Sequence, residues 1–319
     1  MYPSVVLLLV CPVVAAGRTV ASWADFCGLT AHDFMKLDRG EAIGRVLPGK
    51  GPGEIGILGA VRLRANKEAV RVWYSDARNF KDSKVVLAAG EFHNPPGEPD
   101  VAGYALTADD IAALGRCRPG NCGLKLTAGE MERFAAAPGK ENEVAGSILL
   151  EMARGYFQQG DAALAPYHDH KVPVDRVEAY RNLLSAGNCV LEAFPGLAGN
   201  SPEQENLFWS VERYGFGLKA LLNVTHARMF RPSPEVLVVW AKQVRASHYY
   251  EGSLALTVVL DAPGGGAYMV YVNRSRVDLL AGILKGWKRA LVERYAPGSV
   301  RREVARIGRS IERVAAELR

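Results

Sequence analysis

The polar residues best suited to chemistry lie in one long segment of β-branched and aromatic residues, 236–250, and directly after it. This composition predicts a strand, in which residues two apart share a face. One face of that strand would carry Trp240, Lys242, His248 and Tyr250. A histidine close to a carboxylate suits general-base chemistry, and Glu251 follows at the end of the segment. On a regular strand His248 and Glu251 would point to opposite faces, which weakens a catalytic pairing.

A mostly apolar face with a few polar groups is also typical of a small-molecule site. His226 lies on the preceding strand-like segment and would add a further polar group. We therefore expect a ligand site formed by Trp240, Lys242, His248, Tyr250 and His226. The alternative is a hydrolase-type enzyme that uses His248 with Tyr250 or Glu251. The sequence has no nucleophile elbow, P-loop, H-E-x-x-H or dinucleotide-binding fingerprint, which removes the most familiar enzyme classes.

A second polar cluster is the run Tyr167-His168-Asp169-His170. In an extended conformation His168 and His170 would lie on the same side and could hold a metal ion. A third ligand is not evident nearby in the sequence, and such clusters in loops are usually solvated. We therefore expect neither a metal nor another cofactor.

Two of the five cysteines are close together, in Cys117-Arg-Pro-Gly-Asn-Cys122. Pro-Gly is a turn signal, so the two thiols can be brought face to face across a tight loop. Zinc is the rival explanation, but it would need a second close pair of Cys or His residues. We predict a Cys117–Cys122 disulfide, and a Cys27–Cys189 pair follows by elimination only.

The first sixteen residues predict a signal peptide, because 5–16 form an uncharged apolar run followed by small residues and Gly17. The run is too short for a membrane-spanning helix, and no Lys or Arg precedes it. The alternative is a buried strand at the start of the fold. Export would place the protein in the periplasm or outside the cell, where disulfides persist.

The late part of the chain predicts an antiparallel sheet, because its strand-like segments are joined by short connections such as Gly264-Gly265-Gly266. The predicted strands are 55–64, 85–92, 219–230, 236–250, 254–260 and 267–273. The predicted helices before the late strands are 17–45, 66–74, 107–114, 127–137, 143–159, 174–184 and 202–214. These segments indicate one domain, 17–319, with a helical insertion at about 105–215.

Two helices are predicted at the end of the chain, 277–295 and 299–318, separated by Pro297-Gly298. The second has an apolar stripe that must cover the sheet or a partner helix. The stripe consists of Val300, Val304, Ile307, Ile311, Val314 and Leu318. The net charge of +5 is concentrated here, since 281–319 has ten Lys or Arg and four Glu. This basic helix is a candidate for docking on a membrane surface, whereas export argues against nucleic acid as a partner.

The stretch Gly59-Ala-Val-Arg-Leu-Arg-Ala-Asn-Lys-Glu-Ala-Val-Arg-Val-Trp73, with Asp76 after it, resembles the opening strand and first helix of the START-like, helix-grip (SRPBCC-type) superfamily. The late strands and the long terminal helix follow the same order. The chain also resembles exported bacterial proteins of unassigned activity that share its Cys-Arg-Pro-Gly-x-Cys and Ser-His-Tyr-Tyr segments. The superfamily resemblance implies a curved antiparallel sheet wrapped around a C-terminal helix, with a cavity for a lipid or other hydrophobic molecule.

These observations predict an α+β fold, with a curved antiparallel sheet packed against a long C-terminal helix. The leading hypothesis is an exported protein that binds a lipid or other hydrophobic small molecule. The alternatives are the His248 enzyme and a membrane-associated protein that docks through its basic helix.

Overall fold

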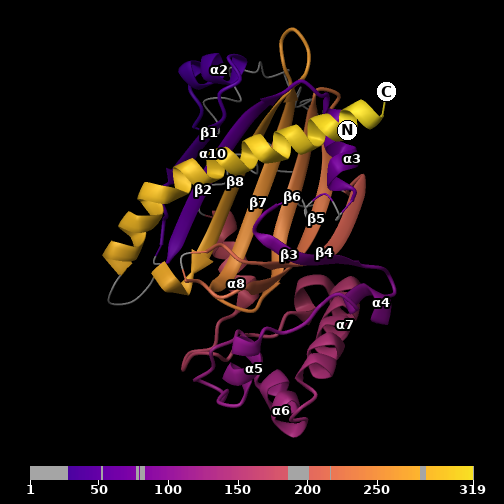
Figure 1. Ribbon diagram of the computed structural model, residues 1–319, viewed down its shortest axis with the longest axis vertical. Helices are drawn as coiled ribbons and strands as arrows, with labels where there is room; N and C mark the ends of the chain where they lie inside the picture. The colour runs from indigo at the N-terminus through magenta and orange to yellow at the C-terminus, as the bar shows by residue number, and fades with distance from the viewer. Residues whose placement is uncertain are drawn as a thin grey trace, which may run out of the picture.

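The computed structural model describes residues 28–51, 53–76, 79, 83–185, 201–215, 217–280 and 285–318. They form an α+β fold whose centre is a curved, open, eight-stranded antiparallel sheet with the order β1-β2-β8-β7-β6-β5-β4-β3 (Figure 1). The predicted fold class is therefore confirmed. The predicted signal peptide, 1–16, and the Cys27–Cys189 pair lie outside the described residues.

The sheet combines early and late parts of the chain, because β2 pairs with β8 along its full length. The strands are β1 Ile43–Leu47, β2 Glu54–Leu63, β3 Val86–Phe92, β4 Gln204–Glu212, β5 Leu221–Ser233, β6 Val236–Ala246, β7 Tyr250–Asp261 and β8 Ala267–Val277. Gly264, Gly265 and Gly266 all have positive φ angles at the turn between β7 and β8, a conformation that glycine adopts without a steric penalty.

Two of the predicted helices begin directly after a capping threonine. Thr107 and Thr127 both form capping boxes, in which the threonine hydroxyl accepts a hydrogen bond from the backbone three residues on. The helices are α2 Ala31–Asp38, α3 Lys67–Tyr74, α4 Glu98–Val101, α5 Ala108–Leu114, α6 Ala128–Ala136, α7 Glu141–Gln159, α8 Arg176–Ser185 and α10 Lys285–Glu317, with short 3₁₀ turns η2 Gly160–Ala163 and η3 Asp278–Leu280. None of the helices described is long and apolar enough to cross a lipid bilayer.

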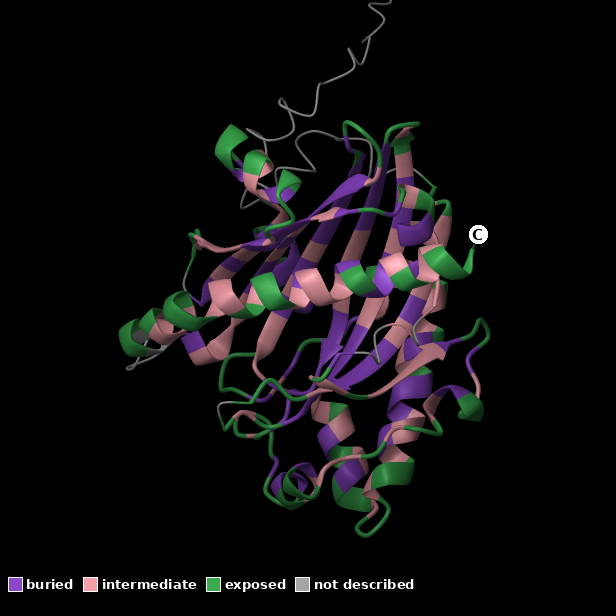
Figure 2. Ribbon diagram, turned by 45° about the horizontal axis from the view of Figure 1, so that its top comes forward, coloured by how far each residue is buried: buried purple, intermediate pink, exposed green. Residues whose placement is uncertain are grey.

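Helices cover both faces of the sheet. α10 runs across one face and meets α3 near its C-terminal end (Figure 1). Trp73 of α3 and Ile311 of α10 are completely buried there, in a core with strand residues such as Met269. Figure 2 shows long buried stretches on the central strands, whereas exposed residues recur along α10. α2, α7 and α8 pack on the opposite side, where α7 covers β4 and β5 and α8 contacts β7. The apolar stripe of the terminal helix therefore covers the sheet.

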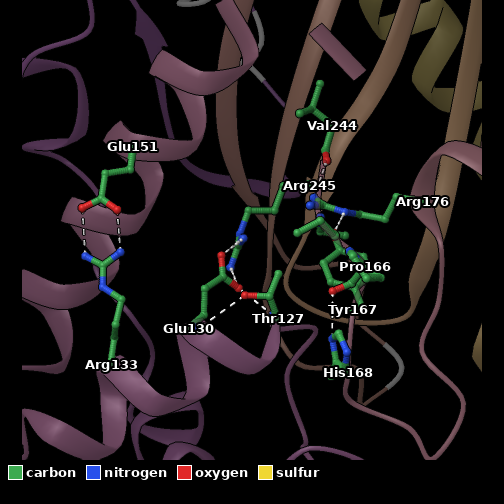
Figure 3. A network of polar contacts seen from close by, with 12 residues as sticks. Thr127, Glu130, Arg133, Glu151, Pro166, Tyr167, His168, Arg176, Val244 and Arg245 are labelled. Atoms are coloured by element: carbon green, nitrogen blue, oxygen red, sulfur yellow. Dashed lines mark hydrogen bonds and ion pairs between the residues drawn. The ribbon is translucent and has the colours of Figure 1, made fainter. Parts of the chain in front are cut away.

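Four helices of the insertion, α4 to α7, lie beyond one end of the sheet (Figure 1). Arg245 of β6 fastens the insertion to the sheet with two hydrogen bonds to the Glu130 carboxylate, at 2.6 and 3.2 Å (Figure 3). Arg176 adds a bond of 3.0 Å from its guanidinium to the Val244 carbonyl. Buried charge pairs of this kind fix the position of the two parts, because separating them would leave a charge without a partner.

The predicted Cys117–Cys122 disulfide is confirmed, with an S–S distance of 2.04 Å. It closes the loop between α5 and α6. The loop backbone is also held by the neighbouring segment of the insertion, because the amide of Gly120 donates to the His168 carbonyl at 2.7 Å.

Three predictions of secondary structure were wrong. The range 202–214 contains strand β4 and no helix, so the insertion lies between β3 and β4, within 93–203, and the predicted bounds 105–215 were too late. The range 17–45, predicted as largely helical, contains α2 but also the start of β1. The two terminal helices are one helix from Lys285 that continues through Pro297, while Val277 ends β8. Pro297 removes one backbone hydrogen bond, but packing on the sheet holds both halves in line.

Candidate functional site

A cavity of about 490 Å³ lies between the sheet and α10. Its walls come from the strands, from α3 and from the segment that leads into β3. Its volume falls within the range of small-molecule pockets, roughly 300 to 1,000 Å³.

The floor of the cavity is a row of three alanines on neighbouring strands. Ala227 pairs with Ala241, and Ala241 pairs with Ala255, so the three lie side by side across β5, β6 and β7. All three line the cavity. A methyl group reaches only a short distance above the sheet, and the space that larger side chains would fill therefore stays open beneath α10.

The roof and one end of the cavity are mostly apolar. Val300, Val304 and Ile307 of α10 line the cavity on the helix side. Trp73 and Met269 close the end next to α3. The indole N–H of Trp73 is satisfied within the protein, since it donates to the Ser310 hydroxyl at 3.0 Å. The hydroxyls of Tyr74 and Thr257, which also line the cavity, are hydrogen-bonded to each other at 2.9 Å, so this end offers a ligand mostly apolar surface.

The other end of the floor is polar, and its groups are hydrogen-bonded to one another. The Asn273 amide donates to the Ser253 hydroxyl at 2.9 Å, and the Ser275 hydroxyl donates to the Asn273 carbonyl oxygen at 2.7 Å. Gln243 donates to Asn223 on the next strand at 2.5 Å. Because hydroxyl and amide groups keep some bonding capacity after such contacts, this end can also receive the polar part of a ligand.

Glu212 places a carboxylate at the edge of this polar end. The Ser210 hydroxyl donates to it at 2.5 Å, and the Tyr214 hydroxyl donates to its second oxygen. Tyr250 is hydrogen-bonded to Tyr214, and burial, together with the Glu212 charge, raises the pKa of Tyr250 to about 12. Tyr214 is 40% exposed, so the cavity reaches the surface here.

Tyr250 is the one residue of the predicted ligand set that lines this cavity. Trp240 and Lys242 alternate with the cavity residues Ala241 and Gln243 along β6, and His226 pairs with Lys242. All three therefore lie on the opposite face of the sheet. The prediction that these side chains converge on one cavity was therefore wrong.

On that opposite face Lys242 and His226 already have partners within the protein. Trp240, in contrast, packs on an apolar cluster, and its buried indole nitrogen has no hydrogen-bond partner in the described part of the chain. Lys242 pairs with Asp161 and lies 4.2 Å from the Tyr180 ring centre, and burial lowers the pKa of its ammonium. His226 is hydrogen-bonded through Nδ1 to the Tyr156 hydroxyl at 3.0 Å. These contacts secure the helices that cover the sheet.

The two remaining catalytic candidates are separated from the cavity and from each other. His248 is 4% exposed, and its Nε2 lies 2.8 Å from an oxygen of Asp110 on α5. Glu251 pairs with Arg276 at 2.5 Å. Regular alternation fails here because β6 ends at Ala246 and the chain turns through Tyr249, whose φ angle is +62°.

The histidine-rich run forms part of a buried charge cluster. Asp169, His170 and Asp278 bring three ligand atoms within 4.8 Å of one another, whereas His168 points away to the Pro166 carbonyl at 3.1 Å (Figure 3). The ammonium of Lys125 lies between the carboxylates, 3.1 Å from Asp169 and 3.0 Å from Asp278. Lys125 thus already supplies the positive charge that a metal would bring, and a metal ion beside it would be repelled.

A scan against models of known protein families finds no match to this chain, and a comparison with curated proteins finds none either. The site therefore has to be interpreted from its own geometry.

Sequence reasoning missed the alanine row and Glu212. The alternation Leu207, Trp209, Val211 was a strand signal for β4, and it places Ser210 and Glu212 together on the other face. The alanines gave no signal of their own, because small residues on a strand indicate a cavity only after the register of three strands is known.

Proposed function

We propose that this protein binds a small hydrophobic or amphiphilic molecule, such as a lipid, between the sheet and α10. The row Ala227, Ala241 and Ala255 carries the proposal, because three small side chains side by side leave a cavity beneath an apolar helix face. Burying apolar ligand surface there would be favourable, by roughly 25 cal/mol per Å².

The arrangement of the elements supports the resemblance to the START-like superfamily. The first strand of the resembling stretch, β2, lies beside the last strand, β8, and the terminal helix crosses the curved sheet. A binding protein is favoured over an enzyme, since His248 is buried against Asp110 outside the cavity.

We also propose that the protein functions in an oxidising compartment, either the periplasm or the outside of the cell. The Cys117–Cys122 disulfide supports it, because disulfides persist in such compartments and are rare in the cytosol.

The test is a fluorescence titration with the neutral probe N-phenyl-1-naphthylamine, displaced by 1-dodecanol. Ala241→Phe would fill the floor of the cavity and should weaken dodecanol binding by about tenfold or more. Ala255→Phe repeats the test on the next strand. Ala136→Phe makes the same change at an exposed position of α6 and should leave binding unchanged. Thermal melting confirms that each variant is folded. No binding by the wild-type protein, or undiminished binding by both folded cavity variants, would overturn the proposal.

A second candidate function is docking on an anionic membrane through the outer face of α10. Arg301, Arg302 and Arg309 are exposed on this helix, and Trp287 is 67% exposed near its start. Clustered basic side chains attract anionic lipids, and tryptophan favours the membrane interface.

Vesicles of phosphatidylcholine with phosphatidylserine test the docking surface. Replacing the three arginines by Gln should release the protein from these vesicles. The matched control replaces three exposed basic residues elsewhere, Lys84, Arg116 and Lys171, by Gln. Equal release by both triple variants would show that the surface is not specific. Deleting the helix would be uninformative, since Val304 and Ile311 belong to the core.

A further inference from the structure

The cavity wall has few charged groups, and they differ in whether they form an ion pair. Of the wall residues that the structure describes, the charged ones are Glu212, Glu303 and Arg306. Arg306 donates two hydrogen bonds to Glu303, at 3.1 and 2.7 Å, so these two charges balance each other. Glu212 accepts hydrogen bonds from the hydroxyls of Ser210 and Tyr214, and among the residues that the structure describes no cation forms an ion pair with it. Within the described part of the wall, Glu212 is therefore the one charge without an ion-pair partner.

Tyrosines surround this carboxylate. Tyr214 and Tyr250 are linked to it through hydrogen bonds, and Tyr271 lines the same cavity. Burial, followed by the charges of neighbouring groups that include Glu212, raises the pKa of Tyr271. Hydroxyl groups hold the carboxylate in place without neutralising it, and the faces of aromatic rings attract cations.

The carboxylate and the apolar floor lie at different parts of one cavity. Glu212 is half-buried at the end of β4, beside the exposed Tyr214, whereas the alanine row and Trp73 lie further in. A molecule that fills the cavity would therefore bury an apolar body under α10 and leave its head next to Glu212.

We propose that the ligand is an amphiphile with a protonated amine as its head, and that Glu212 receives this head. This inference rests on the proposed function, because it assigns a chemical class to the ligand of the same cavity. The ammonium group would donate to the carboxylate oxygens, each of which has room for a further hydrogen bond. An anionic head would be repelled by Glu212. Nη1 of Arg306 has no hydrogen-bond partner among the described residues and could donate to such a head, but the charge of Arg306 is already balanced by Glu303 through its other two nitrogens.

The test compares three ligands with the same chain and different heads: dodecylamine, 1-dodecanol and dodecanoate. Each displaces N-phenyl-1-naphthylamine from the wild-type protein at pH 7. Dodecylamine should bind about tenfold more tightly than dodecanol, and dodecanoate more weakly than dodecanol. Glu212→Gln should remove the preference for the amine and leave dodecanol affinity unchanged. Glu132→Gln, at an exposed position of α6, is the matched control and should keep the preference.

The outcomes separate this inference from the proposed function. If none of the three ligands binds, the proposed function fails. If dodecanol binds as tightly as dodecylamine, or dodecanoate binds best, the cavity binds hydrophobic molecules but the amine assignment is overturned. The comparison on the wild-type protein decides this even if Glu212→Gln does not fold.

Discussion

Gly44 of β1 lies directly against Pro297 of α10, so close that a Cβ atom at Gly44 would come within 2.2 Å of the Pro297 carbonyl oxygen. The backbone of the helix, and not a side chain, occupies that space. Gly59 on the neighbouring strand makes a similar approach, where a Cβ would lie 2.5 Å from Val304 Cγ1. These two glycines thus let α10 pack closely on the edge of the sheet, where the helix forms the roof of the cavity.

Gly44→Ala should therefore lower the free energy of unfolding by about 1–3 kcal/mol, because backbone must move to admit the methyl group. Urea denaturation measures the change. The control is Gly286→Ala on α10 itself, where no atom lies within 4 Å of the added carbon. That substitution should raise stability by roughly 0.5–1 kcal/mol through helix propensity. Equal effects of the two substitutions would show that the close contact between α10 and β1 does not affect the free energy of unfolding.

Much of the fold could be predicted because its signals are local and strong. The apolar stripe from Val300 to Leu318 predicted a helix packed on an apolar surface, and the short turn at 264–266 predicted an antiparallel pair. The segment 202–214 misled because its charged residues resemble those of an amphipathic helix, while its alternation belongs to β4.

The site was harder to predict because both faces of β6 are covered by helices. Trp240 and Lys242 lie on one face of β6, and Ala241 and Gln243 lie on the other. The residue types on the two faces do not indicate which face lines a cavity. β6 also has an extra residue, since Val224 pairs with Arg245 while the next residue pairs with Gln243. Such a bulge ends the alternation on which the sequence argument depends.

Lys125 should contribute strongly to stability. Its side chain is 2% exposed and pairs with Asp169 and Asp278. Although burial opposes the charge, the two carboxylates outweigh it and raise the pKa of Lys125. Lys125→Met would leave two carboxylates without a cation, and we expect a loss of about 3–5 kcal/mol in urea denaturation.

Adding Asp169→Asn to Lys125→Met should recover part of that loss, because one of the unpaired charges is removed. Lys140→Met is the control, since Lys140 is exposed and its nearest carboxylate is 3.9 Å away. It should change stability by no more than about 0.5 kcal/mol. A small effect of Lys125→Met would mean that the buried cluster is solvated in solution.

His248 and Asp110 should stabilise the protein at neutral pH, lose this effect in acid, and play no part in ligand binding. Burial would raise the pKa of Asp110, but hydrogen bonds from His248 and Thr107 outweigh it and lower the pKa below the ordinary value of 3.8. The stabilisation is therefore present above pH 3.8 and is lost as the pH falls through the lower folded-state pKa.

His248→Ala should remove part of this acid dependence and lower stability by roughly 1–3 kcal/mol at pH 7. Its affinity for 1-dodecanol should equal that of the wild type, because His248 lies outside the cavity. Denaturation between pH 2 and pH 7 measures the first effect, and probe displacement the second. Loss of binding by a folded His248→Ala protein would restore the predicted role of this histidine in the site.

The Cys117–Cys122 disulfide closes a short loop, so its removal should have a moderate effect. A loop of this length contributes about 2 kcal/mol in the chain-entropy treatment. We expect the double variant Cys117→Ser, Cys122→Ser to lose about this much, measured by urea denaturation without reductant. Adding dithiothreitol should lower the stability of the wild-type protein relative to the double variant and so reduce the difference between them. Equal stability of the two proteins without reductant would contradict this prediction.

His226 should make the protein less stable as the pH falls from neutrality. Burial lowers the pKa of His226 below its ordinary value of 6.5, and the attraction of Glu205 does not reverse this. The unfolded chain therefore takes up a proton near pH 6.5 while the folded protein resists it. Stability is fully present above pH 6.5 and declines as the pH falls towards the folded-state pKa, by up to about 1.4 kcal/mol per pH unit. His226→Gln removes this titration, so its free energy of unfolding should fall less steeply between pH 7 and pH 5. Denaturation across that range, with the exposed His32→Gln as the matched control, measures the slopes. A His226→Gln slope equal to that of the wild type would contradict the burial argument.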